Sequence, residues 1–354
     1  MDANKSPVQT AIRNPQSEIE GYPLTFAIFG AGNMGRRLAK SLQKVPGVFI
    51  RYVFSRTLSN AQRLAQDCGA VAVDKPDQIF ADNGIHGIID CLPTFTRLET
   101  LRLAVDSGKH IFCEKPLALN PMMAEEIRRI FRGYTKKVMV GQVLRFFWEY
   151  ATLHERMLSG EVGQVGTVRL SRCVGFPGAD SWFADPAKSG GVILDLLIHD
   201  LDFLLWTFGE AQQVFAKSLT DRCQSKLDYA LLNIQLQSGA LAHIEGSWAH
   251  PVGSFHQSVE ICGSKGMLTY DNLNCNPLKW VPTVEPKGEP GSRISLPETD
   301  ASHDPYSAEI EHFVDCIRTD RHPSVSYEEA LKSCELAFLA IESARRGEPM
   351  SNPA

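Results

Sequence analysis

The stretch Leu24–Gly35, which reads LTFAIFGAGNMG, decides the fold of this chain. A run of apolar residues leads into the pattern Gly-x-Gly-x-x-Gly, and an amphipathic segment follows at once. In such a strand–turn–helix unit the first glycine permits a tight turn, the second lets a pyrophosphate approach the backbone, and the third lets helix and strand pack closely. The N-terminus of the helix favours anions. The pattern therefore predicts a dinucleotide loop, with a purely structural glycine turn as the alternative. Its residues are Gly30, Gly32, Asn33, Met34 and Gly35.

Alternation of short apolar runs with amphipathic stretches continues to residue 140. It predicts strands at Leu24–Phe29, Val48–Phe54, Ile88–Cys91, Ile111–Cys113 and Val138–Val140. The helices expected between them are Asn33–Lys44, Ala61–Asp67, Arg97–Ser107 and Met122–Arg132. Such alternation builds a doubly wound parallel sheet. We therefore expect an α/β protein whose residues 23–142 form a Rossmann dinucleotide-binding domain, preceded by a flexible arm over residues 1–22.

The pattern changes after residue 142, where strands dominate. A helix is expected at Tyr150–Leu158 and one long helical stretch at Gly190–Phe208. The predicted strands are Gly166–Cys173, Ala211–Lys217, Ala230–Gln237, Ala240–Trp248 and Gln257–Cys262. Residues 271–304 read as a surface loop rich in Pro, Gly, Asn and Ser, before two final helices. Residues 143–354 are thus expected to form an α+β domain with an open, largely antiparallel sheet.

Composition narrows the class of protein. The chain has 354 residues, 44% of them hydrophobic, and a net charge of −5. No cluster of Lys and Arg offers a surface for nucleic acid, and no apolar run approaches the ~20 residues that cross a bilayer. The nine cysteines are scattered, with no CxxC spacing. That pattern favours a reducing cytoplasm, without a disulfide framework or a bound metal.

The end of the second predicted strand bears on the choice of cofactor. An acidic residue there would bind the ribose 2′-hydroxyl of NAD, but this chain has Ser55 and Arg56, followed by Thr57. A guanidinium and hydroxyls suit a 2′-phosphate, so NADP is favoured over NAD. The alternative is that Arg56 only stacks on adenine and NAD is used.

Two groups of polar residues are candidates for the chemistry. Glu114-Lys115-Pro116 follows a predicted strand at the carboxyl edge of the sheet, where ligands bind in such folds. Lys115 can therefore contact a substrate oxygen, although an ordinary solvated lysine is an equal alternative. A turn from strand end to helix that aims Lys115 at the nicotinamide fits a cis Lys115–Pro116 bond, which X–Pro bonds adopt at low cost.

Asp195 and His199 are the second group. They are four residues apart in an otherwise apolar stretch, so a continuous helix would place them on one face. Burying unpaired polar groups there costs about 1–3 kcal/mol each, so they pair or line a cavity. A histidine suits proton transfer at a hydroxyl. The alternative is a satisfied His–Asp pair in the core. Asp200 and Asp202 are expected to be local structural or capping groups.

Taken together, these segments resemble the glucose–fructose oxidoreductase / inositol dehydrogenase / MocA (Gfo/Idh/MocA) family over residues 23–346. The resemblance rests on the glycine loop, the Glu114-Lys115-Pro116 triplet, Gly190-Gly191 before Asp195 and His199, and residues 260–266. It implies a catalytic set of Lys115, Asp195 and His199. The cofactor contacts that it implies beyond the glycine loop are Ser55, Arg56, Cys91, Pro93, Thr94, Glu114, Lys115 and Trp182.

The chain departs from the family pattern at two places. The family often has a histidine four residues after the proline that follows the fourth strand, whereas Arg97 stands here after Pro93. The family often has an arginine after the tryptophan, whereas Phe183 follows Trp182. Contacts on the nicotinamide side can therefore differ from those of the family.

The resemblance implies a dehydrogenase that moves a hydride between nicotinamide C4 and the carbinol or ketone of a cyclic polyol or sugar. In this mechanism His199 exchanges the hydroxyl proton, Lys115 polarises the reacting oxygen, and Asp195 orients the substrate and Lys115. A homodimer or homotetramer through the C-terminal sheet is also implied. Two alternatives stay open: a hydrolase or lyase of the same fold with a transient redox step, and a non-catalytic dinucleotide-binding regulator.

Overall fold

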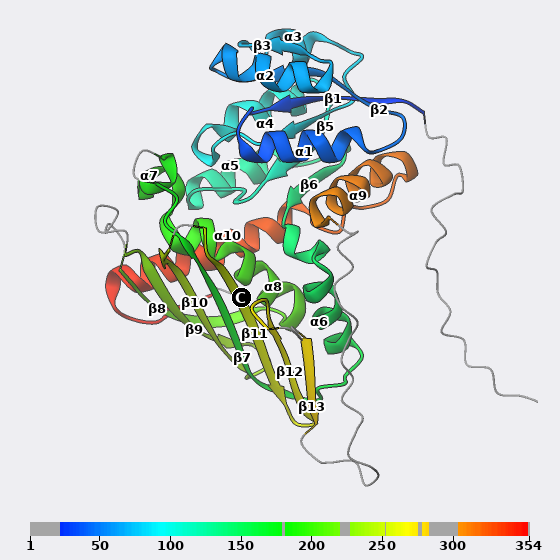
Figure 1. The fold of residues 1–354 in the computed structure, drawn as a ribbon. Coiled ribbons are helices and arrows are strands. Elements are labelled where there is room, and N and C mark those ends of the chain that lie inside the picture. Colours follow the sequence, from blue (N-terminus) through cyan, green and yellow to red (C-terminus); the bar gives the residue numbers. More distant parts are fainter. Residues whose placement is uncertain are drawn as a thin grey trace, which may run out of the picture.

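A computed structural model describes residues 22–178, 181–219, 227–251, 253–274, 278–282 and 304–352. Two sheets organise the chain (Figure 1). Most of the predicted N-terminal arm, residues 1–21, lies outside the described residues. Among the helices that are described, none is both long and apolar enough to span a bilayer.

The first sheet has six parallel strands in the order β3-β2-β1-β4-β5-β6. They are β1 (Leu24–Phe29), β2 (Val48–Phe54), β3 (Val71–Val73), β4 (Gly87–Asp90), β5 (His110–Glu114) and β6 (Val138–Gly141). The helices between them are α1 (Asn33–Gln43), α2 (Leu58–Cys68), α3 (Asp77–Ala81), α4 (Arg97–Asp106) and α5 (Pro121–Phe131). The predicted doubly wound sheet is confirmed, and the short β3 and α3 add to the predicted elements.

The second sheet has eight strands in the order β13-β12-β11-β7-β10-β9-β8-β14. They are β7 (Val165–Gly175), β8 (Ala211–Leu219), β9 (Tyr229–Leu236), β10 (Leu241–His250), β11 (Phe255–Gly263), β12 (Gly266–Asp271), β13 (Leu278–Pro282) and β14 (Met350–Ser351). Every pair is antiparallel except β7 with β10. The predicted open, largely antiparallel sheet is confirmed. The predicted loop at 271–304 is wrong at residues 278–282, because these residues pair with β12 as a strand.

Helices cover one face of this second sheet, and the other face is open. Figure 1 shows α6 (Trp148–Leu158), α8 (Ile198–Phe208) and α10 (Tyr327–Arg346) on the covered face. A capping box is present at the start of α10, between Ser326 and Glu329. The open face is hollowed by a cavity of about 1030 Å³, lined by residues of β7 to β12.

Helix α9 (Pro305–Thr319) follows the second sheet in the sequence but packs on the parallel sheet. It packs against α1, and its Phe313 ring lies 6.1 Å from Phe26 on β1 and 5.7 Å from Phe112 on β5. The C-terminal part of the chain thus completes the hydrophobic cover of the first sheet.

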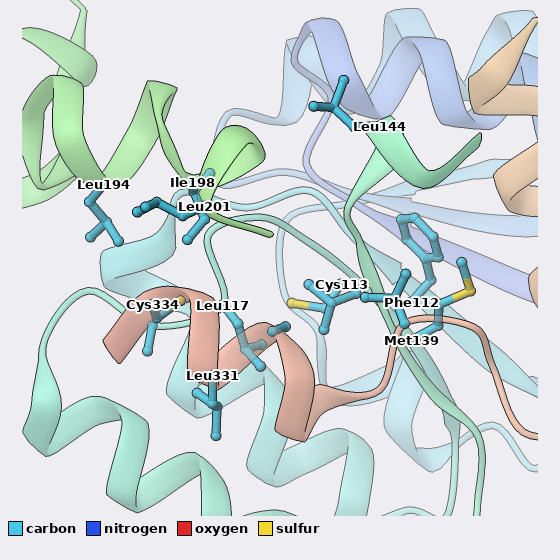
Figure 2. Close-up of a cluster of buried hydrophobic side chains, with 14 of the residues drawn as sticks. Phe112, Cys113, Leu117, Met139, Leu144, Leu194, Ile198, Leu201, Leu331 and Cys334 are labelled. Atoms are coloured by element: carbon cyan, nitrogen blue, oxygen red, sulfur yellow. The ribbon is translucent and has the colours of Figure 1, made fainter. Parts of the chain in front are cut away.

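One apolar cluster joins the turn after β5 to helices α8 and α10. Figure 2 shows Leu117, which follows β5, in the same cluster as Leu194 and Ile198 from the start of the α8 region, and Leu331 from α10. All four side chains are fully buried. Burying a leucine-sized side chain contributes about 1.5–3 kcal/mol, so this packing fixes the turn after β5 relative to α8.

Candidate active site

The glycine loop has the geometry that a dinucleotide requires. Gly30 has a φ of +101°, and a Cβ there would lie 2.8 Å from the Cys91 carbonyl oxygen. A Cβ on Gly35 would lie 1.8 Å from the Gly30 oxygen, so only glycine lets α1 start this close to the turn. Around Gly32 a Cβ would meet no atom within 4 Å, which leaves the backbone open to a ligand.

The start of α1 suits an anion. The first N–H groups of a helix lack partners within the helix. Here no side chain of the described residues caps them, and the first turn holds no acidic residue. Asn33 accepts a hydrogen bond from Arg36 at 2.8 Å. The loop therefore fits the pyrophosphate of a dinucleotide.

Ser55 and Arg56 follow β2 at the same edge of the sheet. The Ser55 hydroxyl accepts a hydrogen bond from the Thr57 N–H at 3.3 Å. Arg56 is exposed and, within the described residues, forms no salt bridge. Its guanidinium is thus available to an anionic group.

The loop after β4 lies beside the turn that follows β5. Thr94 is buried, and its hydroxyl lies 3.5 Å from the Pro116 carbonyl oxygen; Cys91 and Pro93 are half-buried. The exposed Phe95 ring lies 6.0 Å from Trp182, which stacks on Phe183 at 3.9 Å. Phe183, one of the two departures from the family pattern, therefore extends an aromatic cluster that joins the two parts of the chain.

Lys115 projects from the end of β5 toward the second part of the chain. The peptide bond between Lys115 and Pro116 is cis, as predicted. The Lys115 Nζ lies 2.9 Å from the backbone oxygen of Asp195 and 3.4 Å from its Oδ1. Its side chain is 19% exposed, so the interpretation of Lys115 as an ordinary solvated lysine does not hold.

Glu114 precedes this lysine and is buried under the turn. Its Oε2 accepts a hydrogen bond from the Lys115 N–H at 3.2 Å. Burial raises the pKa of Glu114 to about 7, although Lys115 and Arg97 oppose that shift.

The predicted continuous helix over Gly190–Phe208 is wrong in its first half. Gly190 and Gly191 have positive φ angles, a π-helical turn follows at Val192–Leu196, and α8 begins only at Ile198. A Cβ on Gly190 would lie 2.4 Å from the Leu194 side chain, so the start of the π turn requires glycine there. Asp195 and His199 therefore do not share the face of one regular helix.

The wider turn separates the partners of these two residues. The Asp195 carboxylate pairs with Lys115, and within the described residues no hydrogen bond joins it to His199. The His199 Nδ1 is inaccessible and has no hydrogen-bond partner among the residues that the structure describes, while the residue as a whole is half-buried. A satisfied His–Asp core pair is thus excluded.

Burial and two nearby cations keep His199 neutral. Burial, with Lys115 and Arg172 nearby, holds the pKa of His199 well below its usual range. A neutral imidazole at neutral pH can accept a proton, as a general base must. The structure brings Lys115, Asp195 and His199 to one place, at the carboxyl edge of the parallel sheet.

Sequence reasoning missed the buried arginines that support this site. On β7, Arg172 pairs with Asp200 at 2.6 Å; Arg145, which follows β6, pairs with Asp202 at 2.8 Å. The two aspartates were expected to act locally, but they anchor α8 to distant elements instead. An arginine at the inward-facing position of an alternating strand was the available signal for Arg172.

A further buried acid escaped prediction as well. Glu309 on α9 is fully buried, and neither of its carboxylate oxygens has a hydrogen-bond partner in the described part of the chain. Burial, with Glu114 and Asp202 nearby, raises the pKa of Glu309 well above its usual range. In the part of the chain that the structure describes, no group of three His, Cys, Asp or Glu residues could hold a metal ion.

The fold and this site define a nicotinamide-dependent oxidoreductase of two sheets. Residues 24–142 match the profile described as "Oxidoreductase family, NAD-binding Rossmann fold", and residues 150–269 match the GFO/IDH/MocA C-terminal domain. The chain belongs to the Gfo/Idh/MocA family of oxidoreductases.

The chain is similar to relatives of known activity over nearly its whole length. It is 28% identical to the scyllo-inositol 2-dehydrogenase (NAD(+)) of Bacillus subtilis, over 92% of this chain and 95% of that one. It is 25% identical to a D-xylose 1-dehydrogenase (NADP(+)) of Haloferax volcanii, over 92% and 98%. Among solved structures, a myo-inositol dehydrogenase from Corynebacterium glutamicum superposes with a TM-score of 0.78 at 28% identity, over 94% and 100%.

Proposed function

We propose that this protein is an NAD(P)-dependent dehydrogenase that acts on a CH–OH group of a cyclic polyol or sugar. The observation that carries the proposal is the contact of Lys115 with Asp195 beside a neutral His199, at the edge of the sheet where the glycine loop lies. The inositol and xylose dehydrogenases among its relatives favour a polyhydroxylated substrate.

The residues divide the chemistry between them. A bound nicotinamide would supply the hydride acceptor or donor. His199, neutral, accepts the hydroxyl proton during oxidation and returns it during reduction. Lys115 donates a hydrogen bond to the reacting oxygen and stabilises the negative charge that develops there. Asp195 fixes the lysine ammonium and leaves its second oxygen for a substrate hydroxyl.

The glycine loop would hold the cofactor pyrophosphate with the N–H groups of Asn33, Met34 and Gly35. Ser55 and Arg56 lie at the adenosine end, and Cys91, Pro93, Thr94, Glu114 and Trp182 at the nicotinamide end. The exposed Arg56, which has no acidic partner among the described residues, supports a preference for NADP over NAD.

Assembly and location complete the proposal. Residues 23–142 act as the dinucleotide-binding domain and residues 143–354 as the domain for substrate and oligomerisation. The open, hollowed face of the second sheet supports a homodimer or homotetramer. The seven described cysteines are free thiols, which supports a cytoplasmic location; Cys223 and Cys275 lie outside the described residues.

A substrate panel tests this function. The protein is incubated with inositols, pentoses, hexoses and their glycosides, each with NAD and with NADP, and absorbance of the reduced nicotinamide is recorded. We expect net reduction with at least one member, faster with NADP. Consumption of a glycoside without net reduction would favour the transient-redox hydrolase or lyase. Dinucleotide binding without turnover on any member would favour the regulator.

A further inference from the structure

Arg97 opens α4, yet its side chain is buried. Helix starts usually lie at the surface, but Arg97 is 1% exposed and is among the largest fully buried side chains of the described residues. A buried cation is costly unless charge and hydrogen bonds compensate it. The guanidinium must therefore satisfy specific partners.

Those partners lie at the end of β4, in the loop after β4 and in the turn after β5. The Nε of Arg97 donates to the Asp90 Oδ2 at 3.3 Å, at the end of β4. One Nη donates to the Leu92 carbonyl oxygen at 3.1 Å, in the loop after β4, and the other donates to the Pro116 carbonyl oxygen. The Asp90 Oδ1 in turn accepts a hydrogen bond from the Leu92 N–H at 3.0 Å.

The contact with Pro116 connects this network to the chemistry. Pro116 follows Lys115 directly, and the lysine ammonium is held by Asp195 on the other side. We propose that Arg97 is a positioning residue for Lys115. It locks the turn after β5 against the loop after β4, so that the lysine ammonium stays on Asp195 and beside His199. The expected effect on turnover rests on the proposed function. The effect of Arg97 on the position of Lys115 does not depend on that function.

Only arginine supplies this connection. Its planar guanidinium directs donors to three separate acceptors at once, whereas the single ammonium of a lysine at the same position would reach fewer of them. Arg97 stands where the family often has a histidine, so the network belongs to this chain's departure from the family pattern.

His199 reports the position of Lys115 without any substrate. The charged groups around His199 are Lys115 from the turn after β5 and Arg172 from β7, each paired with an aspartate, Asp195 and Asp200. If the lysine ammonium drifts away, one of the two cations that disfavour protonation of His199 is lost, so its titration midpoint rises.

The experiment is a double-mutant cycle read by NMR of the ligand-free protein with ¹³C-labelled histidine. The variants are Arg97→Lys, Lys115→Met and the double variant, and His199→Asn assigns the signal. We expect Arg97→Lys to raise the His199 midpoint, and to leave it unchanged in the Lys115→Met background. Turnover on the best substrate of the panel should fall roughly 10- to 100-fold for Arg97→Lys, as expected for a misplaced catalytic group.

A matched control separates positioning from general stability. Lys109, just before β5 at its opposite end, is 3% exposed and donates to the Asp82 carbonyl oxygen at 2.8 Å. Lys109→Met should lower the melting temperature and leave the His199 midpoint at the wild-type value.

Two results would overturn the proposal. One is an Arg97→Lys variant with a lowered melting temperature but a wild-type His199 midpoint. The other is a midpoint that rises equally with and without Lys115. If Arg97→Lys does not fold, the variant Asp90→Asn/Arg97→Gln is titrated in the same way. This variant removes both charges of the buried Asp90–Arg97 pair. Absence of turnover on the whole panel would count against the proposed function and leave the titration result intact.

Discussion

Replacing His199 by asparagine separates a catalytic histidine from a structural one. Within the described residues the His199 ring forms no salt bridge, and its buried Nδ1 has no hydrogen-bond partner. The substitution therefore removes no hydrogen bond of Nδ1. We expect the free energy of unfolding to change by about 1 kcal/mol or less, which shifts the melting temperature by roughly 2–4 °C.

Turnover should respond very differently. General acid–base catalysis contributes about 10²–10⁴-fold, which corresponds to about 2.7–5.4 kcal/mol at 1.36 kcal/mol per factor of ten. The assay compares kcat on the best panel substrate, the melting temperature, and the affinity for NADP by fluorescence. Cofactor affinity should stay close to that of the wild type.

His154 provides the matched control. It is also half-buried, but it stacks on Trp206 at 3.6 Å and lies 3.3 Å from the Thr207 hydroxyl. His154→Asn should lower the melting temperature and keep kcat. A His199→Asn variant that melts early and retains near-normal turnover when folded would show that His199 is structural.

Three further predictions follow from charges in and near the site. Because the pKa of His199 is lowered, kcat/KM for oxidation should be flat near neutral pH and fall only well below pH 6.5. In the Lys115→Met variant this fall should begin at a higher pH. An unchanged pH profile in that variant would count against the proximity of Lys115 to His199. Glu309 has a raised pKa, so the folded state binds its proton more tightly than the unfolded state and loses stability as pH rises above the ordinary value of 4.5. Glu309→Gln should therefore gain melting temperature relative to the wild type between pH 5 and pH 8, and a constant difference would contradict its burial as a neutral acid. Arg56→Glu should weaken NADP binding by roughly tenfold or more and leave NAD binding nearly unchanged, measured by titration of both cofactors; equal losses for the two would remove Arg56 from the 2′ end.

Local patterns sufficed where local chemistry decides the structure. The first two strands, Leu24–Phe29 and Val48–Phe54, were predicted to the residue, because each is an apolar run bounded by turn residues. The glycine loop and the capping box at Ser326 are equally local. The three-residue β3 and the two-residue edge strand β14 carry too few residues to show a period.

The site was less predictable because its partners are distant in the sequence. Asp195 pairs with Lys115, 80 residues away, while spacing alone suggested a pairing with His199. A π turn that depends on Gly190 and Gly191 rearranges the face of the helix, and periodicity analysis assumes a regular helix there. In the sequence, Arg97 stands out only as a departure from the family pattern, since nothing there shows that its side chain is buried.

Transfer of deuterium tests the central claim most directly. The protein is incubated with NADP and with the best panel substrate deuterated at every carbinol carbon, and the reduced cofactor is analysed by mass spectrometry. We predict one deuterium in each reduced nicotinamide. The His199→Asn variant should form this labelled cofactor only at its residual rate. A reduced cofactor without deuterium, or substrate turnover that leaves all nicotinamide oxidised, would contradict it.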